Sequence, residues 1–186
     1  MCEVEIKAHP ANDEYLDLVD EHDVVIGKKL RSEVYAEHLS NFRVINAFVV
    51  NSKGELWIPR RGPNKRIYPL CLDMSVGGHV ESGEDYEQAF RRETAEELNI
   101  AIDQAPWRLL GHLTPHQDAV SAFMHVYEIK SDKAPDFNRD DFTDFSWFTP
   151  INLIARLESG EKSKSDLIKL VRIFYGPDGV KSGIGN

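Results

Sequence analysis

Gly-Gly-His-Val-Glu-Ser-Gly-Glu-Asp-Tyr-Glu-Gln-Ala-Phe-Arg-Arg-Glu-Thr-Ala-Glu-Glu-Leu-Asn-Ile, residues 77–100, is the stretch from which the rest of this chain can be interpreted. It runs from a glycine-rich loop into a helix that we expect over residues 84–98. At about 100° of rotation per residue, four apolar residues share one stripe of this helix: Tyr86, Ala89, Phe90 and Ile100. Three acidic residues lie on or beside that stripe: Glu93, Glu96 and Glu97. The acids therefore interrupt the side that should be buried.

The position of these acids indicates a bound cation. Acids that simply face water would lie opposite the apolar stripe, where solvent screens them. Partly buried carboxylates within one turn repel one another, and their pKa values should rise unless a cation neutralises them. Oxygen ligands suit Mg²⁺ or Mn²⁺, ions that commonly bridge protein carboxylates and substrate phosphates. The loop glycines Gly77, Gly78 and Gly83 leave the backbone accessible to such a ligand.

The stretch closely resembles the Nudix box: a Gly, five residues, a Glu, seven residues, then Arg-Glu-U-x-Glu-Glu-x-Gly-U, with U aliphatic. The positions in register are Gly78, Glu84, Arg92, Glu93, Glu96, Glu97 and Ile100. Two positions depart from the pattern, because Thr94 replaces an aliphatic residue and Asn99 replaces the final Gly. Asn tolerates the left-handed conformation that ends a helix, so the second change is mild. Thr94 indicates slightly different packing behind the helix.

The resemblance implies the Nudix fold, a mixed α/β architecture in which a mixed β-sheet is sandwiched between helices and the box forms a loop-helix-loop. From about Leu16 to Thr149 the chain is similar to the isopentenyl-diphosphate-isomerase-like branch of the superfamily. Two catalytic features of the isomerases are missing. Gly77 stands where those enzymes have a Cys, and their Glu-x-Glu falls on Val120 and Ala122. We therefore reject isomerase activity.

Membership of this superfamily would imply hydrolysis of a pyrophosphate bond in a nucleoside di- or triphosphate, or in a nucleoside diphosphate linked to another group. The expected metal ligands are the three glutamates and the carbonyl of Gly78, holding Mg²⁺ or Mn²⁺. The residues expected to carry catalysis are Arg92, Glu93, Glu96 and Glu97. The bound ion would activate the attacking water, and one carboxylate would take its proton. Which carboxylate acts as the base stays open.

Other candidate residues have two interpretations each. Glu84 could pair with Arg92 and so fix the loop to the helix, or it could contact the metal. Arg60 and Arg61 end a strand and alternate in direction, so one should point to the site. That side chain could clamp a phosphate or form a salt bridge with an acid. Gly77 is interpreted as a turn glycine and is also assigned to substrate binding, because its bare backbone permits close approach.

The composition favours one soluble globular domain in the cytoplasm. At 186 residues the chain is long enough for a single sizeable core. Its formal net charge of −9 argues against a general nucleic-acid surface, whereas a small anionic substrate stays compatible if cations are bound. No apolar run approaches the roughly 18 residues that span a bilayer. Cys2 and Cys71 give no disulfide framework or metal spacing, and the first residues do not resemble an export signal.

Hydrophobic periodicity and breaker residues predict the elements. Strands are expected over 16–20, 24–30, 43–50, 55–61, 72–76, 107–113, 122–129 and 144–148. Besides the box helix, helices are expected to follow caps at Ser32 and Ser165 and to begin at Pro150. We place an N-terminal arm, hairpin and short helix at residues 1–40, packed on a Nudix domain at 41–176, with a flexible tail at 177–186.

Two other function classes remain to be weighed. A non-catalytic module with the same fold could bind or sense nucleotides, but erosion of the acids would be expected and the acids are intact. Processing of nucleic acids would require a basic tract, which this chain lacks. The sequence contains no constellation that recognises a particular base or sugar. The N-terminal hairpin could serve as a dimer arm, so a homodimer stays open.

Overall fold

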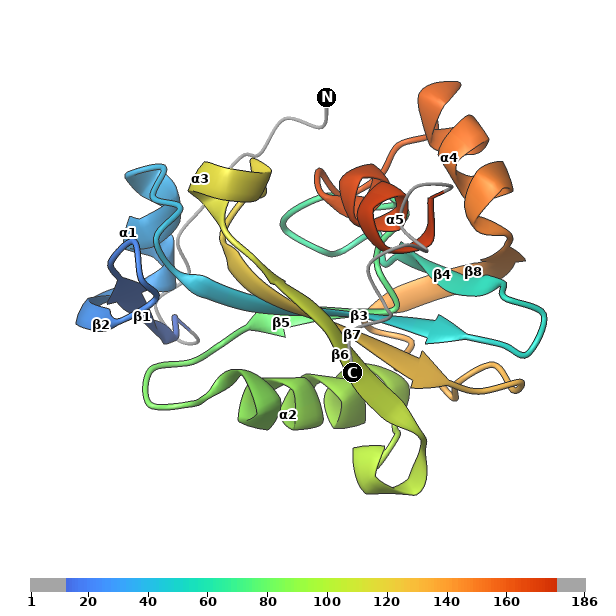
Figure 1. The fold of residues 1–186 in the computed structure, drawn as a ribbon, viewed down its shortest axis with the longest axis horizontal. Helices are drawn as coiled ribbons and strands as arrows, with labels where there is room; N and C mark the ends of the chain where they lie inside the picture. Colours follow the sequence, from blue (N-terminus) through green and yellow to red (C-terminus); the bar gives the residue numbers. More distant parts are fainter. Residues whose placement is uncertain (1–12, 177–186) are drawn as a thin grey trace, which may run out of the picture.

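The strand β3 (Arg43–Val50) is the centre of a six-stranded sheet (Figure 1). Its run Arg-Val-Ile-Asn-Ala-Phe-Val-Val is apolar on both faces, as expected for a strand covered from two sides. Ile45, Ala47 and Val49 point to one core cluster, while Phe48 and Val50 point to another. The computed structural model describes residues 13–176, so the arm expected over 1–12 and the tail expected over 177–186 lie outside it.

The strand order of the main sheet is β6-β7-β3-β4-β8, and β5 also pairs with β3. The other strands are β4 (Leu56–Arg61), β5 (Val76–His79), β6 (Trp107–Leu113), β7 (Phe123–Lys130) and β8 (Phe142–Phe148). β7 runs parallel to β3 and occupies one of its edges. The opposite edge pairs antiparallel with β5 through residues 44–47 and with β4 through residues 49–50. Two strands that share one edge must diverge, and the sheet therefore opens between β4 and β5.

Helices cover both faces of this sheet (Figure 1). The box helix, α2 (Tyr86–Leu98), packs on one face through Ala89, Phe90 and Leu98. The other face is covered by α4 (Pro150–Glu158) and α5 (Leu167–Tyr175). Two short helical segments, η1 (Ile102–Gln104) and α3 (Pro115–Asp118), lie in connections. The mixed sheet sandwiched between helices that the sequence predicts is confirmed.

The ends of α2 follow from local side-chain chemistry. Asp85 accepts the N–H of Gln88 at 2.8 Å, and the Gln88 side chain accepts the N–H of Asp85 at 2.8 Å. This capping box satisfies N–H groups that have no partner within the helix. Asn99 ends the helix with a φ of 54°, the left-handed conformation expected from its place in the motif.

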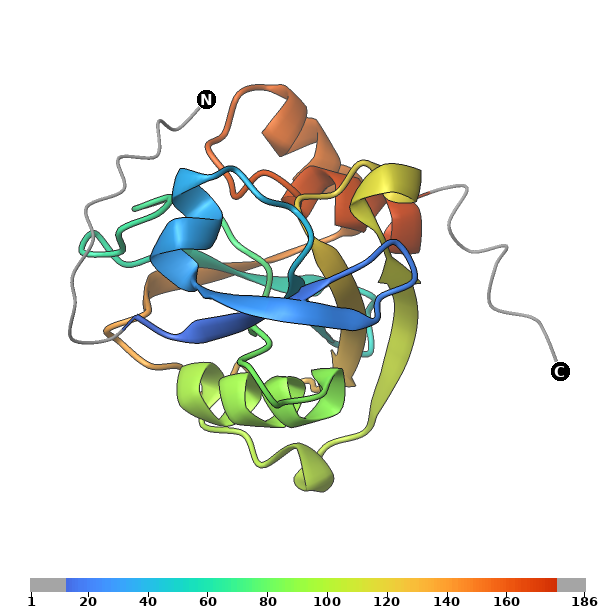
Figure 2. The same ribbon diagram turned by 90° about the vertical axis from the view of Figure 1, so that its left-hand side faces the viewer.

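The N-terminal residues form a hairpin and a helix against the end of the main sheet (Figure 2). These elements are β1 (Tyr15–Val19), β2 (Val25–Leu30) and α1 (Arg31–Ala36). Backbone N–H groups join them to the rest, from Val19 to the Asn41 carbonyl at 2.9 Å and from Ser82 to the Tyr15 carbonyl at 2.8 Å. A separate apolar cluster lies beneath them: Leu16, Val34, Phe42 and Ala122.

Three local predictions were wrong. The strand expected over 72–76 instead begins at Val76, so Gly77 lies within β5 in an extended conformation and is not a turn glycine. The first helix begins at Arg31 after Leu30, and Ser32 binds Asp13 instead of capping. α5 begins at Leu167 after Asp166, and not after Ser165. Among the helices of residues 13–176, none is both long and apolar enough to cross a membrane.

Replacing Phe90 with Ala tests the packing of α2 on the sheet. The ring is fully buried and stacks on Tyr127 at a centroid distance of 4.1 Å. We expect Phe90→Ala to lower the free energy of unfolding by about 3–5 kcal/mol in a urea titration, because it leaves a cavity. Leu109→Ala is the control, since that side chain is 47% exposed. Equal losses in both variants would contradict this packing.

Candidate functional site

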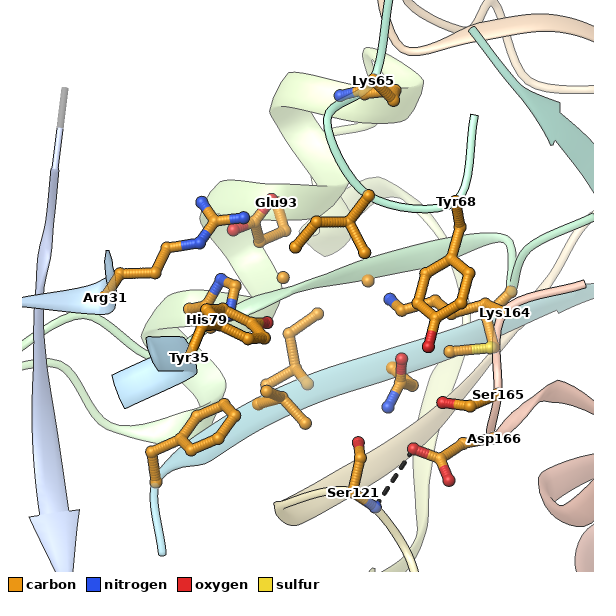
Figure 3. A pocket seen from close by; sticks show the side chains of 18 of the residues that line it. Arg31, Tyr35, Lys65, Tyr68, His79, Glu93, Ser121, Lys164, Ser165 and Asp166 are labelled. Atoms are coloured by element: carbon orange, nitrogen blue, oxygen red, sulfur yellow. Dashed lines mark hydrogen bonds between the residues drawn. The ribbon is translucent and has the colours of Figure 1, made fainter. Parts of the chain in front are cut away.

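A cavity of about 520 Å³ opens beside β3 and β5. Its walls come from parts of the chain that are far apart in sequence: α1, the centre of β3, the loop after β4, β5, α2 and the segment before α5. Figure 3 shows Tyr35 and His79 on one side, Tyr68 and Lys164 on the other, and Glu93 behind them. The volume lies within the roughly 300–1,000 Å³ typical of small-molecule sites.

Glu97 is the most deeply buried acid of α2, with 7% of the residue exposed. One carboxylate oxygen accepts the backbone N–H of Gly77 at 3.0 Å. Burial raises the pKa of Glu97 well above its usual value, and the neighbouring acids Glu93 and Asp73 raise it further. Positive charge brought to this position would favour the anionic form of Glu97.

Glu93 lies against the backbone of Gly78. A Cβ on Gly78 would lie 1.9 Å from the Glu93 carboxylate oxygen and 2.5 Å from its Cγ, so any side chain at this position requires the Glu93 side chain to move. Burial raises the pKa of Glu93 to about 7, although the hydrogen bond from Arg92 at 2.8 Å opposes the shift. The two buried acids and the two glycines therefore form one wall of the cavity.

Arg92 holds this wall in place without lining the cavity. Its guanidinium donates two hydrogen bonds of 2.8 Å to Glu84, one to Glu93 at 2.8 Å and one to the His79 carbonyl at 3.0 Å. The bond from Arg92 lowers the pKa of Glu84. The ion pair between Glu84 and Arg92 is thus present and joins the loop to the helix. It also orients Glu93.

Glu96 differs from its two neighbours, because 58% of its side chain is exposed. It lines the outer part of the cavity, and its carboxylate lies 3.6 Å from Arg92. The expectation that acids interrupt the buried side holds for Glu93 and Glu97 and is wrong for Glu96. The reason is geometric: Glu96 sits 100° from Glu97 on the helix, which carries it past the edge of the buried stripe.

The donor chemistry of this wall fits a hard divalent cation. Carboxylate oxygens and a backbone carbonyl are the ligands that Mg²⁺ and Mn²⁺ prefer. Within residues 13–176, no three His, Cys, Asp or Glu side chains converge closely enough to form a ready-made metal site. Arg92 donates a hydrogen bond to one oxygen of Glu93, and the Gly77 N–H donates one to an oxygen of Glu97. Each carboxylate keeps further lone pairs that could bind an ion while these hydrogen bonds stay in place.

The two arginines at the end of β4 point in opposite directions, as their alternation predicts. Arg61 lines the cavity and forms an ion pair with buried Asp73. Arg60 binds Glu161 at 3.0 Å and the Leu70 carbonyl at 2.9 Å, away from the cavity. Each arginine therefore forms a salt bridge, Arg60 with Glu161 and Arg61 with Asp73, and neither pairs with an acid of α2.

Several lining residues were missed or given little weight by sequence reasoning. Lys164 brings an ammonium group to within 3.1 Å of where a Cβ on Gly77 would lie. Tyr35 and Tyr68 flank the opening (Figure 3). Asp141, on the loop before β8, lines the cavity and pairs with Lys65. No motif marks these residues, since each reaches the cavity through tertiary folding.

His79 is part of a buried polar contact between the box and the N-terminal segment. Tyr35 and His79 share a hydrogen bond of 2.9 Å, and the other ring nitrogen lies 3.4 Å from Glu14. Burial lowers the pKa of His79 well below its usual value, and the positive charges of Arg31 and Lys164 lower it further. The imidazole is therefore neutral, and it ties α1 to the cavity wall.

Comparison with known proteins agrees with this site. The family model of the NUDIX domain matches residues 41–171. An uncharacterized Nudix hydrolase from Nostoc is 60% identical over 162 residues, which cover 87% of this chain and 96% of that protein. A crystal structure of a Deinococcus radiodurans protein is similar at a TM-score of 0.83 and 51% identity, covering 87% of this chain and 99% of that one.

A more distant relative confirms the branch that the sequence indicates. An isopentenyl-diphosphate Delta-isomerase from Photorhabdus laumondii is 27% identical over 149 residues, covering 79% of this chain and 84% of the relative. The positions where the isomerases carry their catalytic residues hold other residues in this structure. Gly77 offers no thiol, and the space beside it faces the Lys164 ammonium group. Val120 and Ala122 are buried apolar residues.

The close contact at Gly78 predicts how a single methyl group would alter the site. We expect Gly78→Ala to displace the Glu93 carboxylate and to weaken Mg²⁺ or Mn²⁺ binding on the order of 10-fold or more. Isothermal titration calorimetry would measure this affinity. Gly27→Ala is the matched control, because a Cβ at Gly27 would have nothing within 4 Å. Unchanged ion affinity in Gly78→Ala would argue against this wall as the metal site.

The pKa of Glu93 predicts a pH dependence of stability in the absence of metal. A folded-state pKa of about 7 exceeds the ordinary value of 4.5, so the folded protein binds more protons than the unfolded chain between these pH values. Stability should therefore fall as pH rises through this window, by about 3 kcal/mol from Glu93. Urea titrations with a chelator would measure the slope, and Glu93→Gln should reduce it. A slope of opposite sign in that window would contradict the assigned pKa shift.

Proposed function

Because this chain belongs to the Nudix family of hydrolases, we propose that it cleaves a pyrophosphate bond in a small nucleoside phosphate, with Mg²⁺ or Mn²⁺ as its cofactor. The substrate is a nucleoside di- or triphosphate, or a nucleoside diphosphate linked to another group. Nudix hydrolases generally use divalent metals. The observation that carries the proposal is the position of buried Glu97 and partly buried Glu93 against bare glycine backbone at the wall of a cavity.

Each residue of this wall has a separate task in the proposed reaction. Glu93, Glu96, Glu97 and the carbonyl of Gly78 hold the metal. When bound, the metal supplies charge neutralisation at the diphosphate and lowers the pKa of the attacking water. The positioning residue Arg92 keeps Glu93 directed at Gly78 through the hydrogen bonds that it also makes to Glu84.

The general base comes from the carboxylates that line the cavity. On α2 these are Glu93, Glu96 and Glu97, and Asp141 lies on the loop before β8. One carboxylate cannot hold the cation through both oxygens and also take the proton, so these tasks are divided among the acids.

Positive charge for the phosphate groups comes from outside the box. Arg61 reaches the cavity from β4 and is partly exposed there, although Asp73 holds one side of its guanidinium. The remaining N–H donors of an arginine can bind phosphate oxygens. The Gly77 backbone allows a substrate to approach without a side chain in the way. Arg60 is excluded from this role by its contacts on the outer surface.

A substrate panel tests the proposal directly. The protein is incubated with Mg²⁺ or Mn²⁺ and with nucleoside di- and triphosphates, nucleotide sugars and dinucleotides, and phosphate-containing products are quantified. We expect hydrolysis of at least one class, dependent on the added metal. Saturable nucleotide binding without hydrolysis of any class would favour a sensing module instead.

Glu97→Gln tests the contribution of the buried carboxylate. We expect kcat/KM to fall by at least about 100-fold, because the amide removes the charge that holds the cation. The fold should persist, since burying a neutral amide costs less than burying a carboxylate. Glu87→Gln on the same helix is the control, with a side chain 50% exposed. Circular dichroism would separate loss of activity from loss of structure, and an unchanged rate would refute the assignment.

A further inference from the structure

The end of the cavity away from Glu93 is lined by polar side chains that the hydrolysis of a phosphate chain does not require. Ser121 lies just before β7, and Ser165 and Asp166 precede α5. Figure 3 shows these residues together at one end of the cavity, with Glu93 at the other. Asn46 of β3 adds a buried amide nearby. The group attached to the phosphates is therefore met by hydrogen-bonding side chains.

Asp166 is buried, with 7% of the residue exposed, and yet its side chain is only partly satisfied. Oδ2 accepts the backbone N–H of Ser121 at 3.2 Å, whereas Oδ1 accepts no hydrogen bond from residues 13–176. Asp166 occupies the capping position of α5, but its side chain accepts no N–H of that helix. A buried carboxylate is costly unless donors surround it. The residue lines the cavity, and Oδ1 stays open to accept a hydrogen bond from a donor that enters it.

The backbone around Asp166 is held rigidly. The Lys164 N–H donates to the Leu72 carbonyl at 2.9 Å, and the Leu72 N–H donates to the Lys162 carbonyl at 2.9 Å. The Leu167 N–H then donates to the Lys164 carbonyl at 3.2 Å, which begins α5. A side chain on such a segment is positioned before any ligand arrives, so less ordering entropy is lost on binding.

Lys164 gives the cavity an electrostatic direction. Its ammonium group lies beside Gly77 and is 3.7 Å from Asp73, too far for a hydrogen bond. Asp73 is already paired with Arg61. The positive charge is thus available to a phosphate group at the metal end, while the carboxylate of Asp166 repels phosphate at the other end. A ligand with phosphate at one end and N–H or O–H donors at the other matches this arrangement.

We propose that Asp166, together with Ser121, forms the subsite that recognises the nucleoside part of the substrate through its hydrogen-bond donors. This inference rests on the proposed function and specifies its substrate. A carboxylate only accepts hydrogen bonds, so it binds an exocyclic amine of a base or the hydroxyl groups of ribose. It disfavours a second phosphorylated group, such as the far half of a dinucleoside polyphosphate. The substrate is therefore a mononucleotide with a donor-bearing nucleoside.

The test uses 5′-monophosphates, which contain no anhydride bond and so report binding without hydrolysis. Calorimetry in Mg²⁺ compares adenosine with inosine and cytidine with uridine, pairs in which the exocyclic amine is replaced by a carbonyl oxygen and the donor moves to the adjacent ring nitrogen. It also compares each ribonucleotide with its 2′-deoxy form. If the base amine is the donor, the wild type should prefer the amine by about 10- to 100-fold. If ribose is the donor, the preference should follow the 2′-hydroxyl.

Asp166→Asn should abolish the preference that the wild type shows, because the amide can donate as well as accept. Asp103→Asn is the matched control, with a side chain 78% exposed outside the cavity. Equal affinity for all members of the wild-type series would overturn the subsite, and so would a preference unchanged in Asp166→Asn. If that variant does not fold, the wild-type series alone decides. If the wild type shows this binding preference but hydrolyses no substrate of the panel, the proposed function is refuted and the subsite still stands.

Discussion

The burial of two carboxylates between α2 and β5 is the constraint on which this structure depends. Glu97 can approach the sheet because the Gly77 N–H donates a hydrogen bond to its carboxylate. Glu93 can approach β5 because Gly78 has no side chain. Arg92 compensates part of the charge and no more, so the pKa values of both acids stay raised. The wall of the cavity is therefore built around two acids whose anionic forms the protein itself only partly stabilises.

The architecture of the sheet provides the space for this wall. β3 pairs with β5 through its first half and with β4 through its end, and the divergence of those two strands leaves room beside the glycines. α2 closes one side of the opening, and the segment before α5 closes the other. α1 completes it through the contact between Tyr35 and His79. Substrate recognition can thus vary with the surrounding segments while the acidic wall stays constant.

Sequence reasoning succeeded where chemistry is local. The extent of β3 and β6, the left-handed end of α2 at Asn99 and the opposite directions of Arg60 and Arg61 follow from patterns within a few residues. It failed where a neighbour in space decides the outcome. The start of β5 depends on its pairing with β3, and the exposure of Glu96 depends on how far the sheet extends beneath α2.

The sequence by itself determined the family, the central position of the acidic helix and the mixed fold, because the box and the hydrophobic periodicity are encoded in consecutive residues. Only the tertiary structure decided which acid is deepest, that Lys164 faces Gly77, and that Asp166 lines the cavity beside Ser121. These features arise from segments up to a hundred residues apart in the chain. Burial and electrostatic environment are properties of the space between such segments, and a linear pattern does not contain them.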